Sequence, residues 1–259
     1  MPGQARILCA GTTDVGRKRT HNEDNFAMVE SEQLFLVADG MGGHASGEVA
    51  SQMAVATMSE FFQATSADPE ATWPYKMDKT RGYEENRLVT GIKLANRRIF
   101  EAAQRETRLH GMGTTIVTLL CSRDQCVIGH VGDSRVYRIR GNTIEQLTED
   151  HSLLNDYMKM KSMTPEEIEN FPHKNVIVRA LGMKDTVKVD AILDKPQAGD
   201  IYLMCSDGLS GQVTADEMRD FVLKHKDLKA ASQALIDRAN ETGGPDNITV
   251  VLARWMGAA

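Results

Sequence analysis

Two apolar runs that each end at an aspartate constrain the fold of this chain most strongly. Residues 34–38 (LFLVA) and 201–205 (IYLMC) have the length and composition of buried strands. Each run stops at an aspartate followed by glycine, Asp39 and Asp207, so both carboxylates are expected at strand ends. Taken singly, an Asp-Gly pair is also a common turn for reasons of backbone geometry alone.

Further acidic segments turn this pattern into a hypothesis about a metal site. Glycines and a proline precede Asp246, and residues 247–252 then read as another strand. Glu23 and Asp24 form a fourth acidic segment. Clusters of oxygen ligands suit hard divalent cations such as Mg²⁺ and Mn²⁺, and the sequence offers no Cys/His pairing at zinc spacing. We therefore predict that these ends converge on one cleft with oxygen-ligand chemistry.

Length, charge and cysteine usage narrow the class of protein. The chain has 259 residues, and we expect one domain over residues 1–259. Its net charge is −6, from 30 basic and 36 acidic residues without a long run of like charge, which argues against a nucleic-acid surface. The four cysteines include no Cys-x-x-Cys pair, which fits a reducing compartment. No apolar run approaches the ~20 residues that cross a bilayer, so we expect a soluble, cytoplasmic, monomeric protein that binds no membrane.

Periodicity predicts where the main helices and strands lie. Apolar residues recur at spacings of 4, 3, 4 and 3 from Leu88 to Ala102, which is typical of a helix, and a second helix is expected at about 47–62. Capping boxes at Thr164 and Thr214 predict two later helices. Strands are expected at 114–122, 125–131, 135–139, 143–147 and 187–193.

The order of these elements favours antiparallel sheets with helices outside them. The strands between 114 and 147 follow one another through short turns, so we predict an antiparallel meander. Residues 65–82 show no periodicity and contain Pro69 and Pro74, so we expect a surface excursion. The expected layering is two antiparallel sheets faced by helices.

An ordered set of motifs over nearly the whole chain resembles the PPM-type metal-dependent protein phosphatases, the protein phosphatase 2C family. In chain order the motifs are RTHNEDN (19–25), DGMGGH (39–44), GMGTT (111–115), GDSR (132–135), DHS (150–152), RALG (179–182), SDGL (206–209) and DN (246–247). The DGMGGH wording is similar to the bacterial branch. The resemblance implies an α+β fold, an αββα sandwich of two antiparallel sheets flanked by helices.

The resemblance also implies a ligand set for two Mn²⁺ or Mg²⁺ ions. By this resemblance, Asp39 bridges the two ions. The carbonyl of Gly40 and a water held by Glu23 serve one ion, and Asp207 and Asp246 serve the other. Two cations about 3.5–4 Å apart can orient a shared water and offset charge on a phosphoryl group.

Three further residues receive roles from the same resemblance. Asp24 would hold waters around the ions. Asp133 would bind a third, weaker ion with Asp207, although a turn-capping role for Asp133 stays open. Arg19 would grip the substrate phosphate, because a planar guanidinium suits bidentate contact with phosphate oxygens.

The function implied is hydrolysis of phosphoserine and phosphothreonine in phosphorylated proteins, by attack of a water bridging the two ions, in opposition to a bacterial serine/threonine kinase. A pseudophosphatase that binds phosphoproteins without turnover is an alternative, which the presence of Asp39, Asp207 and Asp246 disfavours. A phosphatase dedicated to an anti-sigma-factor antagonist is a second alternative with the same chemistry.

The chain departs from the family pattern in two places. Met41 stands where many animal and plant members carry a histidine proposed as the proton donor, and a thioether cannot donate that proton. A metal-bound water could donate the proton instead, and His44 is a weaker candidate because a loop histidine is more often structural. Gly211 stands where many members carry an acid, which puts the third ion in doubt.

A methionine-rich segment at about 150–175 occupies the place of the family's variable flap. It contains Met158, Met160 and Met163, and methionines adapt to varied surfaces. Contact with substrate is one hypothesis for this segment, and plain helix packing is the other.

Overall fold

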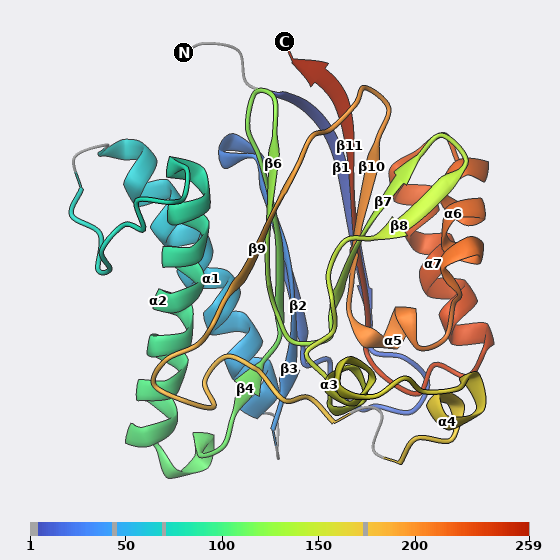
Figure 1. The fold of residues 1–259 in the computed structure, drawn as a ribbon, viewed down its shortest axis with the longest axis horizontal. Coiled ribbons are helices and arrows are strands. Elements are labelled where there is room, and N and C mark those ends of the chain that lie inside the picture. The colour runs from blue at the N-terminus through green and yellow to red at the C-terminus, as the bar shows by residue number, and fades with distance from the viewer. Residues whose placement is uncertain (1–4, 43–45, 69–70, 173–175, 259) are drawn as a thin grey trace.

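Two antiparallel sheets packed face to face, each covered on its outer side by a pair of helices, make up the fold (Figure 1). The computed structural model describes residues 5–42, 46–68, 71–172 and 176–258. The predicted αββα sandwich is confirmed. His44 lies outside the described residues, so its proposed role stays a prediction.

The first sheet has the strand order β1-β11-β10-β7-β8, with antiparallel neighbours throughout. Its strands are β1 (Ala5–Asp14), β7 (Arg135–Arg140), β8 (Thr143–Gln146), β10 (Ile201–Cys205) and β11 (Ile248–Ala258). Helices α6 (Ala215–Lys224) and α7 (Leu228–Glu241) cover its outer face (Figure 1). The capping box predicted at Thr214 is present at the start of α6.

The second sheet has the order β2-β3-β5-β6-β9, with the short β4 paired to β3. Its strands are β2 (Asp24–Val29), β3 (Leu34–Met41), β4 (Gly113–Thr114), β5 (Ile116–Cys121), β6 (Cys126–Val131) and β9 (Asp190–Asp194). Helices α1 (Ser46–Ala67) and α2 (Tyr83–Arg105) cover its outer face. Short 3₁₀ turns lie at Glu30–Glu32 (η1) and Thr107–Leu109 (η2).

Three short helices lie at the end of the sandwich opposite the two chain termini (Figure 1). They are α3 (Leu153–Met160), α4 (Pro165–Glu169) and α5 (Asp207–Ser210). The predicted capping box at Thr164 is present at the start of α4. No helix in the described ranges is both long and apolar enough to cross a membrane.

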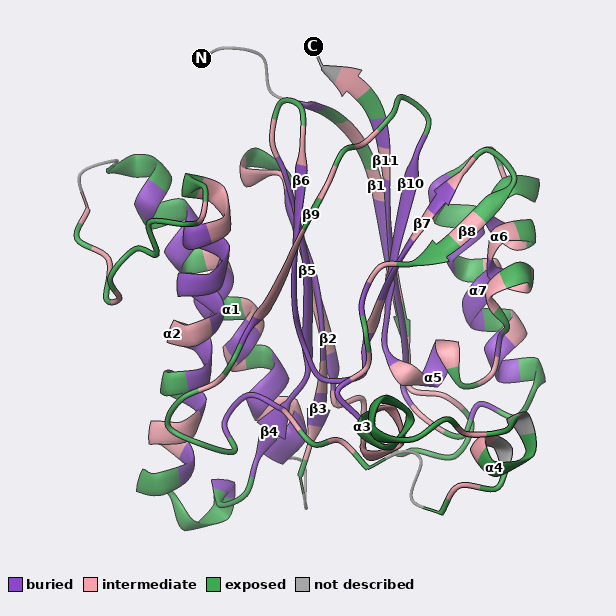
Figure 2. Cartoon of the chain, viewed as in Figure 1, coloured by how far each residue is buried: buried purple, intermediate pink, exposed green. Residues whose placement is uncertain are grey.

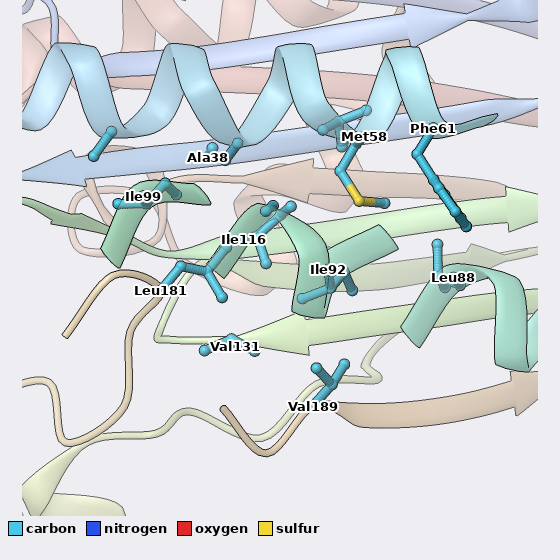
Figure 3. Close-up of a cluster of buried hydrophobic side chains, with 14 of the residues drawn as sticks. Ala38, Met58, Phe61, Leu88, Ile92, Ile99, Ile116, Val131, Leu181 and Val189 are labelled. Carbon is cyan, nitrogen blue, oxygen red and sulfur yellow. The ribbon is translucent and has the colours of Figure 1, made fainter. Parts of the chain in front are cut away.

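Buried side chains fill three layers, one between the sheets and one under each helix pair (Figure 2). The predicted stripe on α2 is confirmed, because Leu88, Ile92 and Ile99 are fully buried against the second sheet. Figure 3 shows them beside Met58 of α1 and Ile116 of β5. This packing fixes the second sheet in place, and with it the strands that carry the acidic residues.

The predicted meander is wrong in its connectivity. Strands β5 and β6 pair in the second sheet, whereas β7 and β8 pair in the first. Residues 132–134 therefore carry the chain from one sheet to the other instead of forming a hairpin. Gly132 has φ +114°, a conformation that glycine adopts readily. Alternation along a strand reveals its two faces but not the sheet to which it belongs, so periodicity could not show this crossing.

Several element boundaries also differ from the predictions. Helix α1 runs to Ala67, into the segment predicted as a surface excursion. Strand β3 does not stop at residue 38, because pairing with β4 continues the ladder through Asp39 to Met41. Strand β9 begins only at Asp190, three residues after the predicted start.

Candidate functional site

The pairing of β2 with β3 places two acidic side chains next to each other. Asp24 lies directly opposite Asp39 in this antiparallel ladder, so both carboxylates project from the same face. Asp24 is buried, and its Oδ2 accepts hydrogen bonds from Ser206 Oγ and Thr249 Oγ1, each at 2.7 Å. Because both donors belong to the other half of the sandwich, Asp24 joins the two sheets at this end.

The first sheet contributes Asp207 and Asp246. Asp207 is the first residue of α5, directly after β10 and Ser206, and its negative charge acts on the carboxyl of Asp39. Asp246 precedes β11, and its Oδ1 accepts a hydrogen bond from the backbone N–H of Asn247 at 2.8 Å. The predicted convergence is confirmed for these carboxylates. The two strand ends and the turn before β11 meet at one end of the sandwich.

Glu23 and Gly40 pack against the first turn of α1. The backbone N–H of Gly40 donates to the carbonyl of Glu23 at 3.1 Å. A Cβ on Gly40 would lie 2.1 Å from the carbonyl oxygen of Gly47, so no larger residue fits at this position. The close approach of the α1 backbone is thus a reason for glycine that the sequence did not show. Glu23 Oε1 is buried, and no described residue forms a hydrogen bond with it.

Asp133 lies in the turn by which the chain crosses between the sheets. It is 8% exposed, and its buried Oδ1 has no hydrogen-bond partner within the described part of the chain. The next residue, Ser134, shares a 2.7 Å hydrogen bond with Thr115 Oγ1, which also accepts from the backbone N–H of Asp39 at 3.1 Å. The turn that carries Asp133 is therefore tied to the strand that carries Asp39.

A cavity of about 550 Å³ opens beside these residues. Its walls include Asp133, Asp207 and Asp246 on one side and Ser152 and Leu154 at the start of α3 on the other. The cavity thus extends from the carboxylates to the predicted flap segment.

Burial and mutual repulsion raise the pKa values of this carboxylate cluster. Burial raises the pKa of Asp24 to about 7 and that of Asp133 to about 7, and the negative charge of Asp207 adds to both. Burial, followed by the charges of Asp24 and Asp207, raises the pKa of Asp39 well above its usual range. The pKa values of Asp207 and Glu23 are also raised, chiefly by burial. Like charges crowded in this way are stabilised by a cation among them.

The cluster fits hard divalent cations on the chemistry of its donors. Three buried oxygens have no hydrogen-bond partner among the described residues: Glu23 Oε1, Asp24 Oδ1 and Asp133 Oδ1. Buried polar atoms are nearly always paired, so an orphaned set of oxygens in one place indicates an external ligand. Carboxylate and carbonyl oxygens are the ligands that Mg²⁺ and Mn²⁺ prefer.

Comparison with known proteins gives the family. The Protein phosphatase 2C family model matches residues 13–255. The chain belongs to the protein phosphatase 2C family. It is similar to the serine/threonine phosphatase stp of Listeria welshimeri, with 40% identity over 247 residues that cover 93% of this chain and 92% of the relative.

Two solved structures of this family resemble the chain closely. The structure of serine/threonine phosphatase Stp1 from Staphylococcus aureus matches with a TM-score of 0.86 and 32% identity, over 99% of this chain and 98% of that one. The catalytic domain of the phosphatase PstP in complex with two manganese ions matches with a TM-score of 0.80 and 32% identity, over 96% and 97% of the two chains. The chain is therefore a metal-dependent protein serine/threonine phosphatase of the bacterial type.

This phosphatase also contains a histidine cluster that the sequence analysis did not predict. The ligand atoms of His130, His151 and Asp190 all lie within 4.8 Å of one another. Arg179 occupies this cluster, with Nη1 2.8 Å from His151 Nε2 and 3.2 Å from Asp190 Oδ1. A guanidinium already balances the carboxylate, so we read the cluster as a hydrogen-bonded network and not as a metal site. The DHS and RALG motifs contain His151 and Arg179, but neither motif indicated a role for them.

Proposed function

We propose that this phosphatase hydrolyses phosphoserine and phosphothreonine in proteins at the carboxylate cluster, in opposition to a serine/threonine kinase. The observation that carries this proposal is the convergence of acidic side chains from both sheets around three buried oxygens without hydrogen-bond partners. The match of the family over residues 13–255 supports treating residues 1–259 as one catalytic domain.

The proposed ligand set keeps the assignments that the family resemblance implies. Asp39 lies opposite Asp24 in the β2–β3 ladder and is close enough to Asp207 for the two charges to act on each other, which supports its proposed role as the bridge between two ions. Asp207 and Asp246 would hold one ion, and the carbonyl of Gly40 with Glu23 would hold the other. Asp24 would orient waters, and Asp133 would hold a third ion with Asp207. When bound, divalent cations would activate the attacking water and offset negative charge on the phosphoryl group.

Arg19 is the proposed phosphate-binding residue. Its side chain is 48% exposed, and its Nη2 donates to Asp246 Oδ2 at 2.8 Å, which holds the guanidinium at the edge of the carboxylate cluster. A guanidinium has five N–H groups, so donors remain for a phosphate beside the same carboxylate. Arg19 would orient the phosphoryl group and neutralise part of its charge as it binds.

The flap, residues 150–175, is proposed to contact the protein substrate. Its first helix, α3, exposes Met158 at 44% and Met160 at 85%. Packing against the rest of the chain cannot account for a methionine as exposed as Met160, which favours substrate contact over plain helix packing for that residue. Leu154 of α3 lines the cavity beside the carboxylates, so a bound peptide would meet the flap there.

A flap deletion separates these two readings. Replacing residues 155–172 by a short glycine-serine linker should change the relative rates on different phosphoproteins more than the rate on a small aryl phosphate. Equal losses on both kinds of substrate would contradict substrate contact by the flap.

The test of the proposed function uses metal-stripped protein and a phosphothreonine peptide. Phosphate release is measured while Mn²⁺ or Mg²⁺ is titrated in, for the wild type and for Asp207→Ala. We expect release that depends on the metal and disappears in the variant. No release from folded wild-type protein at any metal concentration would support the pseudophosphatase alternative.

A further inference from the structure

The backbone of Gly132, directly before Asp133, is held by a buried imidazole pair. Its N–H donates to His151 Nδ1 at 3.0 Å, and its carbonyl accepts from His130 Nε2 at 2.8 Å. The same carbonyl accepts a second hydrogen bond from the backbone N–H of His151 at 2.8 Å. The two bonds to the carbonyl are therefore redundant, whereas His151 Nδ1 is the single acceptor that the described residues offer to the N–H.

His151 itself has little freedom to move. Its ring is 5% exposed and stacks on the His130 ring, with 4.2 Å between the centroids. Because Nδ1 accepts from Gly132, we assign the proton of the neutral ring to Nε2, which then donates to Asp190 Oδ2 at 2.9 Å. Arg179 Nη1 lies 2.8 Å from the same Nε2, and in this tautomer its N–H is directed to Asp190 Oδ1 and not to the ring. Arg179 lies against this same carboxylate and holds it in place. The hydrogen bond to Asp190 thus fixes the orientation of the ring, and with it the position of Nδ1, the acceptor for Gly132.

The same residue lies at the base of the flap. The backbone N–H of Val178 donates to the carbonyl of His151 at 2.9 Å, and that of Leu153 donates to the carbonyl of Val176 at 2.8 Å. Backbone hydrogen bonds therefore join the two ends of the flap next to His151. One side chain connects the flap base to the turn that carries Asp133.

We propose that His151 is a positioning residue for Asp133, holding the Gly132 backbone so that the carboxylate stays aimed at its cation. This inference rests on the proposed role of Asp133 as a ligand of the third ion. None of the residues that the structure describes forms a hydrogen bond with Asp133 Oδ1, so the position of this oxygen depends on the backbone around it. Ser134 anchors one side of the turn to Thr115, and His151 anchors the other.

Two substitutions at His151 separate its two hydrogen bonds. His151→Asn places an amide oxygen near the position of Nδ1, so it keeps an acceptor for Gly132 but does not reach Asp190. His151→Gln reaches toward Asp190 but lacks the acceptor at Nδ1. His130→Gln is the matched control, because it alters an even more buried imidazole, 1% exposed, whose bond to Gly132 is redundant.

Mn²⁺ binding to metal-stripped protein is measured by equilibrium dialysis and by the electron paramagnetic resonance of free Mn²⁺. Asp133→Asn is the reference variant. We expect His151→Gln to lower the affinity for the most weakly bound Mn²⁺ by about tenfold or more, which is typical when a residue that orients a metal ligand is lost. The affinity for the more tightly bound ions should not change. His151→Asn and His130→Gln should stay within about threefold of the wild type.

Thermal unfolding of each variant provides the structural control. If His151→Gln does not fold, Asp190→Asn serves as a milder variant, since it removes the charge that orients the ring, and it should weaken the same ion class more than His130→Gln does. The inference would be overturned if His151→Gln bound the weakest class of Mn²⁺ with the affinity of the wild type. The same holds for Asp190→Asn where it replaces His151→Gln. Equal losses in His151→Gln and His130→Gln would also overturn it, because they would indicate a merely structural role.

The reference variant distinguishes failure of the inference from failure of the proposed function. If Asp133→Asn binds every Mn²⁺ ion as the wild type does, the role of Asp133 is wrong and the inference fails with it. If Asp133→Asn loses an ion that His151→Gln retains, only the role of His151 is wrong.

Discussion

The carboxylate cluster and the buried cation Arg87 show two different ways of burying charge. Arg87 is 7% exposed and donates to Glu32 Oε2 at 2.9 Å and to the carbonyl of Phe62 at 2.6 Å. It also donates to Thr65 and Ser66, and it lies 4.3 Å above the centroid of the Phe62 ring. In the carboxylate cluster the neighbouring charges have the same sign, and three oxygens have no hydrogen-bond partner in the described ranges.

This difference in hydrogen-bond and charge partners distinguishes a buried charge that stabilises the fold from one that serves function. Arg87 connects η1, the end of α1 and the start of α2, and the chain itself supplies an opposite charge and neutral acceptors for the cation. At the carboxylate cluster the chain supplies too few donors, so folding leaves a deficit that only an external cation can offset. A buried charge with partners indicates a structural joint, and a buried charge without them indicates a ligand site.

Removing the central charge of the carboxylate cluster should have the largest effect. We expect Asp39→Asn to lower kcat for a phosphothreonine peptide by roughly 1,000-fold or more, because it removes a preorganised charge at the reacting centre. Phosphate release under saturating Mn²⁺ measures this loss.

The same variant tests whether the cluster is strained without metal. Because Asp39 repels Asp24 and Asp207, metal-free Asp39→Asn should be at least as stable toward urea as the metal-free wild type. A marked loss of stability would mean that Asp39 supports the fold, and the contrast with Arg87 would break down.

Arg87→Met should have the opposite profile. We expect the free energy of unfolding to fall by about 3 to 4 kcal/mol, because Glu32 is left buried without its partner. The affinity for Mn²⁺ should not change. Urea denaturation and Mn²⁺ titration of the same protein measure both quantities. The double variant Arg87→Met, Glu32→Gln should recover part of the loss, since it removes the unpaired carboxylate.

The sequence predicted the composition of the site better than its surroundings. Asp39, Asp207 and Asp246 could be placed together because each lies at the boundary of an apolar run, where burial and a turn coincide. The residues that hold them could not be foreseen. Ser206 and Thr249 approach Asp24 only through the packing of one sheet on the other, and sequence spacing does not carry that information.

The fold shows the same limit. The stripe on α2 was predictable because 3.6-residue periodicity is local, and capping boxes marked α4 and α6 for the same reason. The crossing of the chain between sheets at Gly132 depends on which strands pair, which is a long-range property. Helix α7 and strand β1 were left without a prediction, although α7 buries Leu228, Leu235 and Ile236 along one side.

Arg19 offers a way to sharpen the comparison from within the carboxylate cluster. Arg19→Ala should lower kcat/KM for the phosphopeptide by roughly 10- to 100-fold, the size of one lost hydrogen bond between charged groups. Mn²⁺ affinity should hold or rise, because Asp246 loses a competing cation. Arg19→Lys keeps the charge but not the bidentate geometry, so it should recover only part of the activity. Weaker Mn²⁺ binding in Arg19→Ala would show that the guanidinium supports the ligands instead of the substrate.

The smallest effect is expected at Glu217, a surface carboxylate whose partners the chain supplies. It accepts hydrogen bonds from the backbone N–H of Thr214 at 3.0 Å and from Arg238 Nη2 at 2.8 Å. These donors, the backbone N–H first, lower the pKa of Glu217 from 4.5 to about 2, in contrast to the raised values at the carboxylate cluster. The folded state then binds fewer protons than the unfolded state between these values, so the contribution of Glu217 to stability is present above pH 4.5 and is lost as the pH falls toward 2.

Comparing the wild type with Glu217→Gln by urea denaturation tests this sign. The difference in midpoint should be present at about pH 6 and should shrink by about pH 3, because protonation removes from the wild type what the substitution removes from the variant. Both effects are small, since the group is exposed and solvent screens its charge. A difference that grows as the pH falls would mean that the pKa of Glu217 is raised, as it is for the residues of the carboxylate cluster. The presence of hydrogen-bond partners within the chain would then no longer distinguish Glu217 from that cluster.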